Sequence, residues 1–174
     1  PAPPEPAAAL EPAALLQRVQ ALQESEARFR RMADASPACI WLPALVPERV
    51  VYVSPSFERI WGRPVEALYG DPRLWVEGIH PEDRARVGEA FGHWVESGTA
   101  DPWSAEFRIQ RPDGSVRWIH ERGRRISDAN QERVSGISTD ITERVLAEAA
   151  LRESEQRFAL AVAAANEGIW DLDL

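Results

Sequence analysis

The sequence has little cysteine, no excess of basic residues and no long apolar run. Cys39 is the single cysteine among 174 residues, so no internal disulfide can form and a cysteine-rich zinc site is not expected. The formal net charge is −8, unlike the Lys- and Arg-rich surfaces that bind nucleic acid. No apolar run approaches the roughly 20 residues of a membrane-spanning helix, and the N-terminus does not resemble a signal peptide. We therefore expect a cytoplasmic protein without nucleic-acid or membrane contacts.

The usual patterns of an enzyme active site are also missing. The sequence shows no nucleophile paired with a base, no fixed pair of carboxylates and no glycine-rich phosphate loop at a meaningful spacing. We expect no catalytic residue and no metal ligand in this segment, and we place any catalytic output outside it. Tryptophan is abundant by contrast, because seven occur in the chain, and these residues are the expected anchors of a hydrophobic core.

An internal repeat sets the expected domain plan. Residues 22–45 and 151–174 align without a gap at a shift of 129 residues, and ten of the 24 positions are identical. Average residue usage would give about two identities. The repeat is domain-sized, and its second copy stops at the end of the sequence. We therefore divide the chain into a Pro/Ala-rich lead-in and amphipathic helix (1–23), one complete module (24–142), a linker helix (143–157) and the truncated start of a second module (158–174).

The N-terminal helix carries an apolar seam. Its apolar residues recur at a three-four spacing, at Leu15, Val19, Leu22 and Phe29, with Glu26 as an interruption. Such a seam suits a short coiled coil between two copies of the chain. The alternative is a helix that folds back on its own domain. We favour a homodimer, because both flanking helices carry apolar seams.

The middle of the chain combines short strands with short helices. Strands are expected at 39–42, 49–54, 103–109, 115–126 and 134–137, with 43–48 as the first connection and a Pro-Asp-Gly turn at 112–114. Helical turns bounded by proline and glycine are expected at 54–62, 64–70 and 71–76, and a longer helix at 81–98. This order predicts an α+β domain with one antiparallel sheet.

The stretch from Ser135 to Arg144 changes from strand to helix within a few residues. Asp140 is expected to be the N-cap of the exit helix, and Glu143 follows three residues later, which is the spacing of a capping box. No flexible Gly/Ser linker separates the strand from the helix. A rigid joint of this kind can pass a conformational change out of a domain. We therefore expect Asp140, Ile141, Thr142 and Glu143 to transfer the signal.

The order and spacing of several short motifs are informative. They are Ser25-Glu26 with Arg28-Phe29, Tyr52–Phe57, His80–Arg84, Glu106–Arg108, Pro112–Gly114, Arg117–Ile119 and Asp140–Thr142. Together they resemble a PAS domain with its C-terminal PAC motif, as found in bacterial sensory proteins. The resemblance covers about residues 24 to 144 and restarts near residue 153. It implies a PAS fold: a five-stranded antiparallel sheet with short helices on one face, flanked by N-terminal and C-terminal helices.

The resemblance also raises the question of a cofactor, since some PAS domains hold haem, flavin or small organic ligands. We do not expect haem, because His93 lies off the apolar stripe of its helix. Covalent flavin chemistry is not expected either, because residues 57–61 hold no cysteine. An empty core is our default, with a non-covalent flavin or a small metabolite left open. The candidate pocket wall is Trp41, Trp61, Trp75 and Trp118, whose alternative role is plain core packing.

These observations predict a sensory module of a bacterial signal-transduction protein. By resemblance, the complete protein is a histidine kinase of a two-component system or a cyclic-dinucleotide enzyme, whose output domain lies in the same chain. The module would sense a ligand or partner and relay the change through the exit helix. The alternative is a ligand-free spacer that serves only dimerisation or interaction.

Overall fold

A single five-stranded sheet forms the centre of the molecule. The computed structural model describes residues 12–45, 48–128 and 131–167. The strands are β1 (Cys39–Leu45), β2 (Glu48–Val53), β3 (Trp103–Gln110), β4 (Val116–Asp128) and β5 (Gln131–Asp140). Their spatial order is β2-β1-β5-β4-β3, and every neighbouring pair is antiparallel. The strand that leads to the exit helix, β5, therefore lies in the middle of the sheet.

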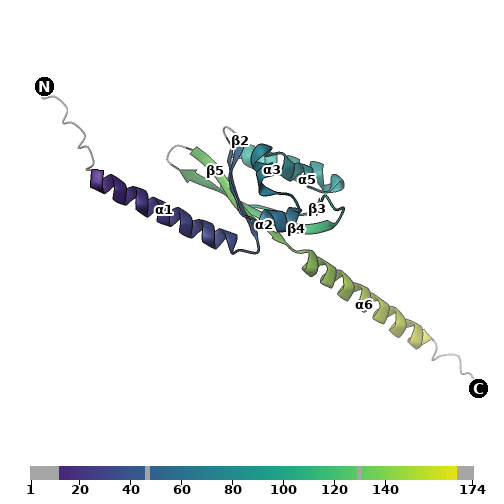
Figure 1. Cartoon of the computed structure of the whole chain (residues 1–174). Helices are drawn as coiled ribbons and strands as arrows, with labels where there is room; N and C mark the ends of the chain where they lie inside the picture. The colour runs from purple at the N-terminus through teal and green to yellow at the C-terminus, as the bar shows by residue number, and fades with distance from the viewer. Residues whose placement is uncertain (1–11, 46–47, 129–130, 168–174) are drawn as a thin grey trace, which may run out of the picture.

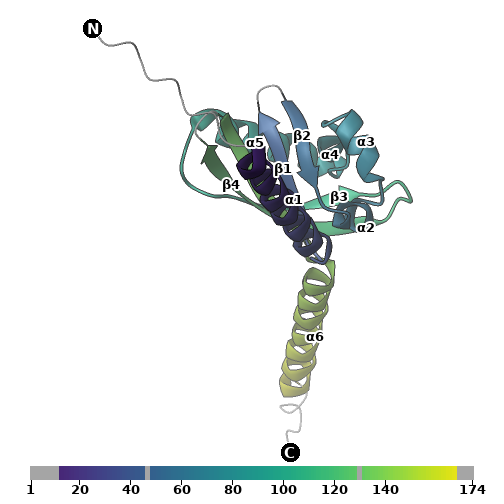
Figure 2. The ribbon, with the colours of Figure 1, turned by 60° about the vertical axis from the view of Figure 1, so that its left-hand side comes forward.

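Four helices lie on one face of this sheet, and two more extend away from it. The covering helices are α2 (Ser56–Trp61), α3 (Val65–Gly70), α4 (Leu74–Glu77) and α5 (Pro81–Ser97). Helices α1 (Pro12–Asp34) and α6 (Thr142–Glu167) project from the domain in different directions, as Figure 1 and Figure 2 show. The predicted α+β class, the five-stranded antiparallel sheet and the two flanking helices are confirmed.

Two helices of the covering layer end as the sequence indicates. Gly62 follows α2 with φ 67°, and Gly98 follows α5 with φ 66°. Glycine adopts this left-handed conformation without the steric penalty of a Cβ atom, so both helices stop there and the chain can turn back toward the sheet.

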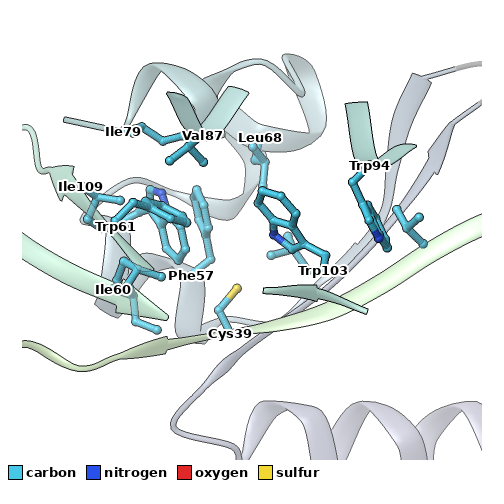
Figure 3. Packing of buried hydrophobic residues seen from close by; sticks show 14 residues of the cluster. Cys39, Phe57, Ile60, Trp61, Leu68, Ile79, Val87, Trp94, Trp103 and Ile109 are labelled. Atoms are coloured by element: carbon cyan, nitrogen blue, oxygen red, sulfur yellow. The ribbon is translucent and has the colours of Figure 1, made fainter. Parts of the chain in front are cut away.

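The core fills the space between the sheet and α2 to α5. Phe107, Ile109, Ile119, Val134, Ile79 and Val87 are fully buried. Phe57 stacks on Trp61 with ring centroids 5.0 Å apart, and Figure 3 shows these two rings beside Ile60 and Ile109. The core therefore combines aliphatic side chains with aromatic rings, including the tryptophans Trp61, Trp94 and Trp103.

The start of α5 is clamped to the edge strand β3. Asp83 is 8% exposed and accepts hydrogen bonds from the Arg108 backbone N–H (2.8 Å) and from two of its guanidinium nitrogens (2.9 and 3.0 Å). These bonds from Arg108 lower the pKa of the Asp83 carboxyl to about 2. The motif His80–Arg84 therefore has a structural task, because it fixes the longest covering helix against the sheet.

The first strand is longer than the sequence indicates. Residues 43–48 are expected to connect two strands, but β1 continues to Leu45 and β2 begins at Glu48. The pairing register between β1 and β2 shifts between Leu42 and Pro43. Along its other edge, β1 pairs with β5 at Trp41 and next at Ala44. A β-bulge is one of the few places where a sheet tolerates proline, so the strand accommodates Pro43 there.

The flanking helices have little contact with the sheet along their length. Ala33, near the end of α1, is the buried residue of that helix. Helix α6 runs as one helix through the expected linker at 143–157 and into the expected second module. Within the described residues, no helix is both long and apolar enough to cross a bilayer. The start of the lead-in and the C-terminal end of the expected second module lie outside the described residues.

Candidate functional site

A cavity of about 110 Å³ lies between the sheet and its covering helices. Aromatic side chains from several elements line it, together with strand residues from β1, β2, β4 and β5. The lining includes Cys39, Trp41, Val50, Val53, Phe57, Trp61, Leu68, Trp75, Phe91, Glu121 and Ser138. Single-ring molecules occupy apolar cavities of about 150 Å³. The space therefore suits a small, mostly apolar molecule.

The structure separates the four tryptophans expected to form a pocket wall. Trp41, Trp61 and Trp75 line the cavity, whereas Trp118 does not. Side chains alternate between the two faces of a strand, so Ile119 and Glu121 of β4 point toward the helices and Trp118 points to the opposite face. There the guanidinium of Arg108 lies 5.7 Å from the centre of the Trp118 ring. Trp118 is therefore corrected from a wall residue to an outer-face residue.

Two glycines create the space for the Trp41 ring. Gly123 and Gly136 pair directly across β4 and β5. A Cβ atom on Gly136 would lie 2.2 Å from the Trp41 ring, and one on Gly123 would lie 2.8 Å from it. The indole therefore lies flat against two strands, and its Nε1 donates a hydrogen bond to Ser138 Oγ at 3.0 Å. This contact fixes the part of the cavity wall that β1 contributes.

A carboxylate is buried in this otherwise apolar space. Glu121 is 5% exposed, and it accepts hydrogen bonds from Trp103 Nε1 at 3.2 Å and from Ser138 Oγ at 3.0 Å. Burial raises the pKa of Glu121 to about 7, although both hydrogen bonds act in the opposite direction. The Glu121 side chain therefore changes its charge near neutral pH, and the cavity contains a polar group whose charge can respond to its surroundings.

Cys39 also lines the cavity, but its thiol is unreactive. Figure 3 shows its sulfur directed toward Phe57 and the other rings of the core. Burial, helped by the nearby Glu121 carboxylate, raises the pKa of the Cys39 thiol to about 12. A thiol that stays protonated is a poor nucleophile, so Cys39 acts as a small apolar wall residue.

The cavity does not fit a haem. None of its lining residues in the described part of the chain is a histidine. His93 is exposed on α5, and His80 accepts a hydrogen bond from Glu82 N at the start of that helix. His120 lies on the outer face of β4, hydrogen bonded to Ser104 Oγ at 3.1 Å. The cavity of about 110 Å³ is smaller than a 150 Å³ cavity that holds the single ring of benzene. The three-ring system of a flavin is therefore too large for it.

The second candidate region is the joint between β5 and α6, which differs from the expected capping box. Helix α6 begins at Thr142, and Ile141 is its N-cap because its carbonyl accepts the bond from Val145 N at 3.0 Å. Asp140 Oδ1 accepts from Thr142 N at 2.9 Å and from Thr142 Oγ1 at 2.5 Å. The expected cap position is therefore one residue too early, but the Asp140 carboxylate does accept from a backbone N–H at the helix start, in a tight turn with Thr142 rather than with Glu143.

This joint is fixed to β4 by hydrogen bonds in both directions. Ile141 N donates to Trp118 O at 2.8 Å, and Trp118 N donates to Thr142 Oγ1 at 2.9 Å. Arg144 then forms an ion pair with Glu106 of β3 at 2.7 Å. The first turn of α6 is thus attached to both β4 and β3.

Sequence reasoning missed Glu121 and Ser138, which lie opposite each other on β4 and β5. A signal for Glu121 existed, because it shares its strand face with the apolar Ile119. Trp118, the wall residue expected from this strand, lies on the other face. Ser138 offered no comparable signal, since small polar residues are common throughout the last strand.

Comparison with known proteins agrees with this architecture. The family described as the PAS fold matches residues 50–139. The protein y4lL of Sinorhizobium fredii is 33% identical over 135 residues, which are 74% of this chain and 15% of that protein. The "Probable diguanylate cyclase DgcE" of Escherichia coli is 27% identical over 123 residues, which are 66% of this chain and 11% of that protein. The chain thus spans less than a fifth of the length of these relatives.

Solved structures show the same arrangement. A sensory box histidine kinase/response regulator from Burkholderia thailandensis superposes with a TM-score of 0.56 at 28% identity, and the match covers 76% of this chain and 98% of that one. The family match, the antiparallel sheet with helices on one face and these relatives agree with one another. The chain therefore belongs to the PAS family and is a sensory module of a signalling protein.

Proposed function

We propose that this module senses a small ligand or a partner at the cavity and relays the change through β5 into α6. One observation carries the proposal: Ser138 lines the cavity and lies two residues before Asp140 on the same strand. A shift of Ser138 therefore displaces the residues that hold the start of α6. The cavity and the exit joint are two ends of one short, continuous segment.

The relay needs no large rearrangement. A ligand that binds one packing of β4 and β5 better than another shifts the population toward that packing. Because Trp118 accepts a hydrogen bond from Ile141 and donates one to Thr142, the first turn of α6 follows β4 and β5. The expected output is a change in the tilt or rotation of α6, which its 26 residues carry away from the domain.

The relatives suggest what receives the signal. They include a histidine kinase/response regulator and a diguanylate cyclase, so we propose a kinase or a cyclic-dinucleotide enzyme as the output domain in the same protein. Catalysis would then occur in that domain. We also propose a cytoplasmic location, which fractionation of cells that express the complete protein would test.

Exposed apolar residues on both flanking helices support a homodimer. They are Leu15, Leu16, Val19, Leu22 and Met32 on α1, and Leu146, Leu151, Phe158, Leu160 and Val162 on α6. The same residues favour the second candidate function, a spacer that only dimerises. Native mass spectrometry and an absorbance spectrum of the purified protein separate the two. A bound small molecule supports the sensor, and a dimer that never takes up a ligand supports the spacer.

The relay is tested most directly at Asp140. Asp140→Ala removes the acceptor of two hydrogen bonds from Thr142, so it should cost about 1 kcal/mol of helix-start stability. We expect faster amide hydrogen exchange over the first turn of α6 and a weaker response of the output domain in the complete protein.

Asp113→Ala is the matched control. Asp113 makes a similar side-chain turn with Ser115 at the β3–β4 hairpin, through hydrogen bonds that do not involve α6. It should leave both exchange in α6 and the output response unchanged. An Asp140→Ala protein that signals like the wild type would refute the relay.

A further inference from the structure

We infer that the cavity recognises a small protonated amine, with Glu121 as the group that binds its nitrogen. This inference rests on the proposed function, because it names the class of ligand that the sensory cavity takes. It depends on the geometry of Glu121, on the aromatic wall around the cavity and on its volume.

The hydrogen-bond directions show that Glu121 acts as an acceptor. Trp41 Nε1 donates to Ser138 Oγ, and the Ser138 hydroxyl donates in turn to Glu121 Oε2. Trp103 Nε1 donates to Glu121 Oε1. An ionised carboxylate offers about four acceptor positions, and each oxygen here uses one. The Glu121 carboxylate therefore retains one free acceptor position on each oxygen.

The charge of this carboxylate is not balanced by its recorded donors, because both are neutral side chains. A buried charge without a paired cation is costly, and a cationic ligand would reduce that cost. Arg49 also lines the cavity, but it is exposed. It pairs with Ala44 of β1, and Ala44 lies five residues from Cys39 on that strand. Cys39 pairs with Ser138, so Arg49 lies roughly 16 Å along the strand from the Glu121 end.

The aromatic wall suits the same ligand. Trp41, Trp61 and Trp75 line the cavity together with Phe57 and Phe91. Aromatic faces attract cations, most strongly at desolvated sites. A cavity of about 110 Å³ has room for few non-hydrogen atoms. A compact alkylamine meets all three conditions, whereas an anion of the same size would face the Glu121 charge directly.

The test compares three molecules of one shape: isobutylamine, isobutanol and isobutyrate. Tryptophan fluorescence reports binding, because three tryptophans line the cavity. Molecules with five or six non-hydrogen atoms bind weakly, so the titrations should extend to about 10 mM. At pH 8 we expect isobutylamine to bind at least about tenfold more tightly than isobutanol, and isobutyrate to bind least.

Glu121→Gln keeps the shape of the side chain and removes its charge. It should weaken isobutylamine binding about tenfold and leave isobutanol binding within about twofold. Glu155→Gln removes one exposed charge from α6 and should change neither affinity. Near-ultraviolet circular dichroism verifies that both variants are folded.

Equal binding of amine and alcohol, preferential binding of isobutyrate, no binding of isobutylamine, or an unchanged amine affinity in Glu121→Gln would each overturn the inference. These outcomes are distinct from failure of the relay. If isobutylamine fails to bind but Asp140→Ala still weakens the output response, the relay remains and the ligand class is wrong. If isobutylamine binds without any change in α6 exchange, the relay is wrong.

Discussion

The two helices that leave the domain are attached in different ways. Helix α6 continues directly from the central strand β5, and hydrogen bonds to β4 and an ion pair to β3 hold its first turn. Helix α1 reaches the sheet mainly at its end, where Phe29 packs against Tyr52 of β2 at 5.3 Å and Asp34 accepts from the Tyr52 hydroxyl at 3.0 Å. Strand β2 is an edge strand, so a change at the centre of the sheet reaches α6 first.

The largest difference between the attachments of α6 and α1 should appear when the central strand β5 is overpacked. In Gly136→Ala, the new Cβ would lie 2.2 Å from the Trp41 ring and 2.3 Å from the Arg122 carbonyl oxygen. We expect a loss of at least about 3 kcal/mol in the free energy of unfolding, because the backbone on one side and the half-buried, hydrogen-bonded Trp41 ring on the other both resist displacement. Urea denaturation measures it.

Gly88→Ala is the control for that substitution. Gly88 lies inside α5, and a Cβ atom there meets nothing within 4 Å. Alanine is the better helix former, so this variant should be more stable by about 0.5 to 1 kcal/mol. A Gly136→Ala protein as stable as the wild type would mean that Trp41 does not hold its position against β5.

The next largest effect concerns Glu121, the buried carboxylate beside β5. None of the α1 contacts described above involves a buried carboxylate. Burial raises the pKa of Glu121 to about 7 in the folded protein. Between about pH 4.5 and 7 the folded state keeps a proton that the unfolded state has lost, so this group makes the protein less stable as pH rises through that window. The facing Cys39 thiol, with a pKa of about 12, stays neutral throughout.

Glu121→Gln should therefore be more stable than the wild type at pH 8, by on the order of 3 kcal/mol, and nearly equal to it at pH 4.5. Thermal denaturation of both proteins across this range measures the difference. A constant difference at all pH values would show that folding does not raise the pKa of Glu121. A wild-type protein that gains on the variant as pH rises would reverse the sign of the argument.

A smaller effect is expected at the exit joint itself. Thr142→Val removes the hydroxyl that accepts from Trp118 N and that donates to Asp140. We expect a loss of about 1 to 2 kcal/mol, because the Trp118 N–H is left without its acceptor. Amide exchange at Trp118 should accelerate. Thr139→Val, three residues earlier at a half-buried position of β5, should leave that exchange rate unchanged, and equal rates in both variants would contradict the proposed joint.

The sequence was sufficient for the fold because local signals and the sheet agree. Proline and glycine mark the short helices, and alternation marks β3 and β4. It failed where an interaction is nonlocal. Pro43 lies inside a strand because a bulge accommodates it, and Trp118 points outward because the register of β4 places Ile119 inside. The Glu121–Ser138 pair required the strand order, since residues 17 apart meet only in the folded sheet.

The smallest effect is expected where α1 is attached to β2. Tyr52→Phe removes the hydrogen bond to Asp34 but keeps the ring that packs against Phe29. The bond is exposed, so its loss should cost about 0.5 kcal/mol. Spin labels on α1 should become more mobile, while exchange at the first turn of α6 stays as in the wild type. If instead α6 responded to Tyr52→Phe as strongly as to Thr142→Val, the two attachments would be coupled through the sheet, and the entrance helix would be an input to the relay.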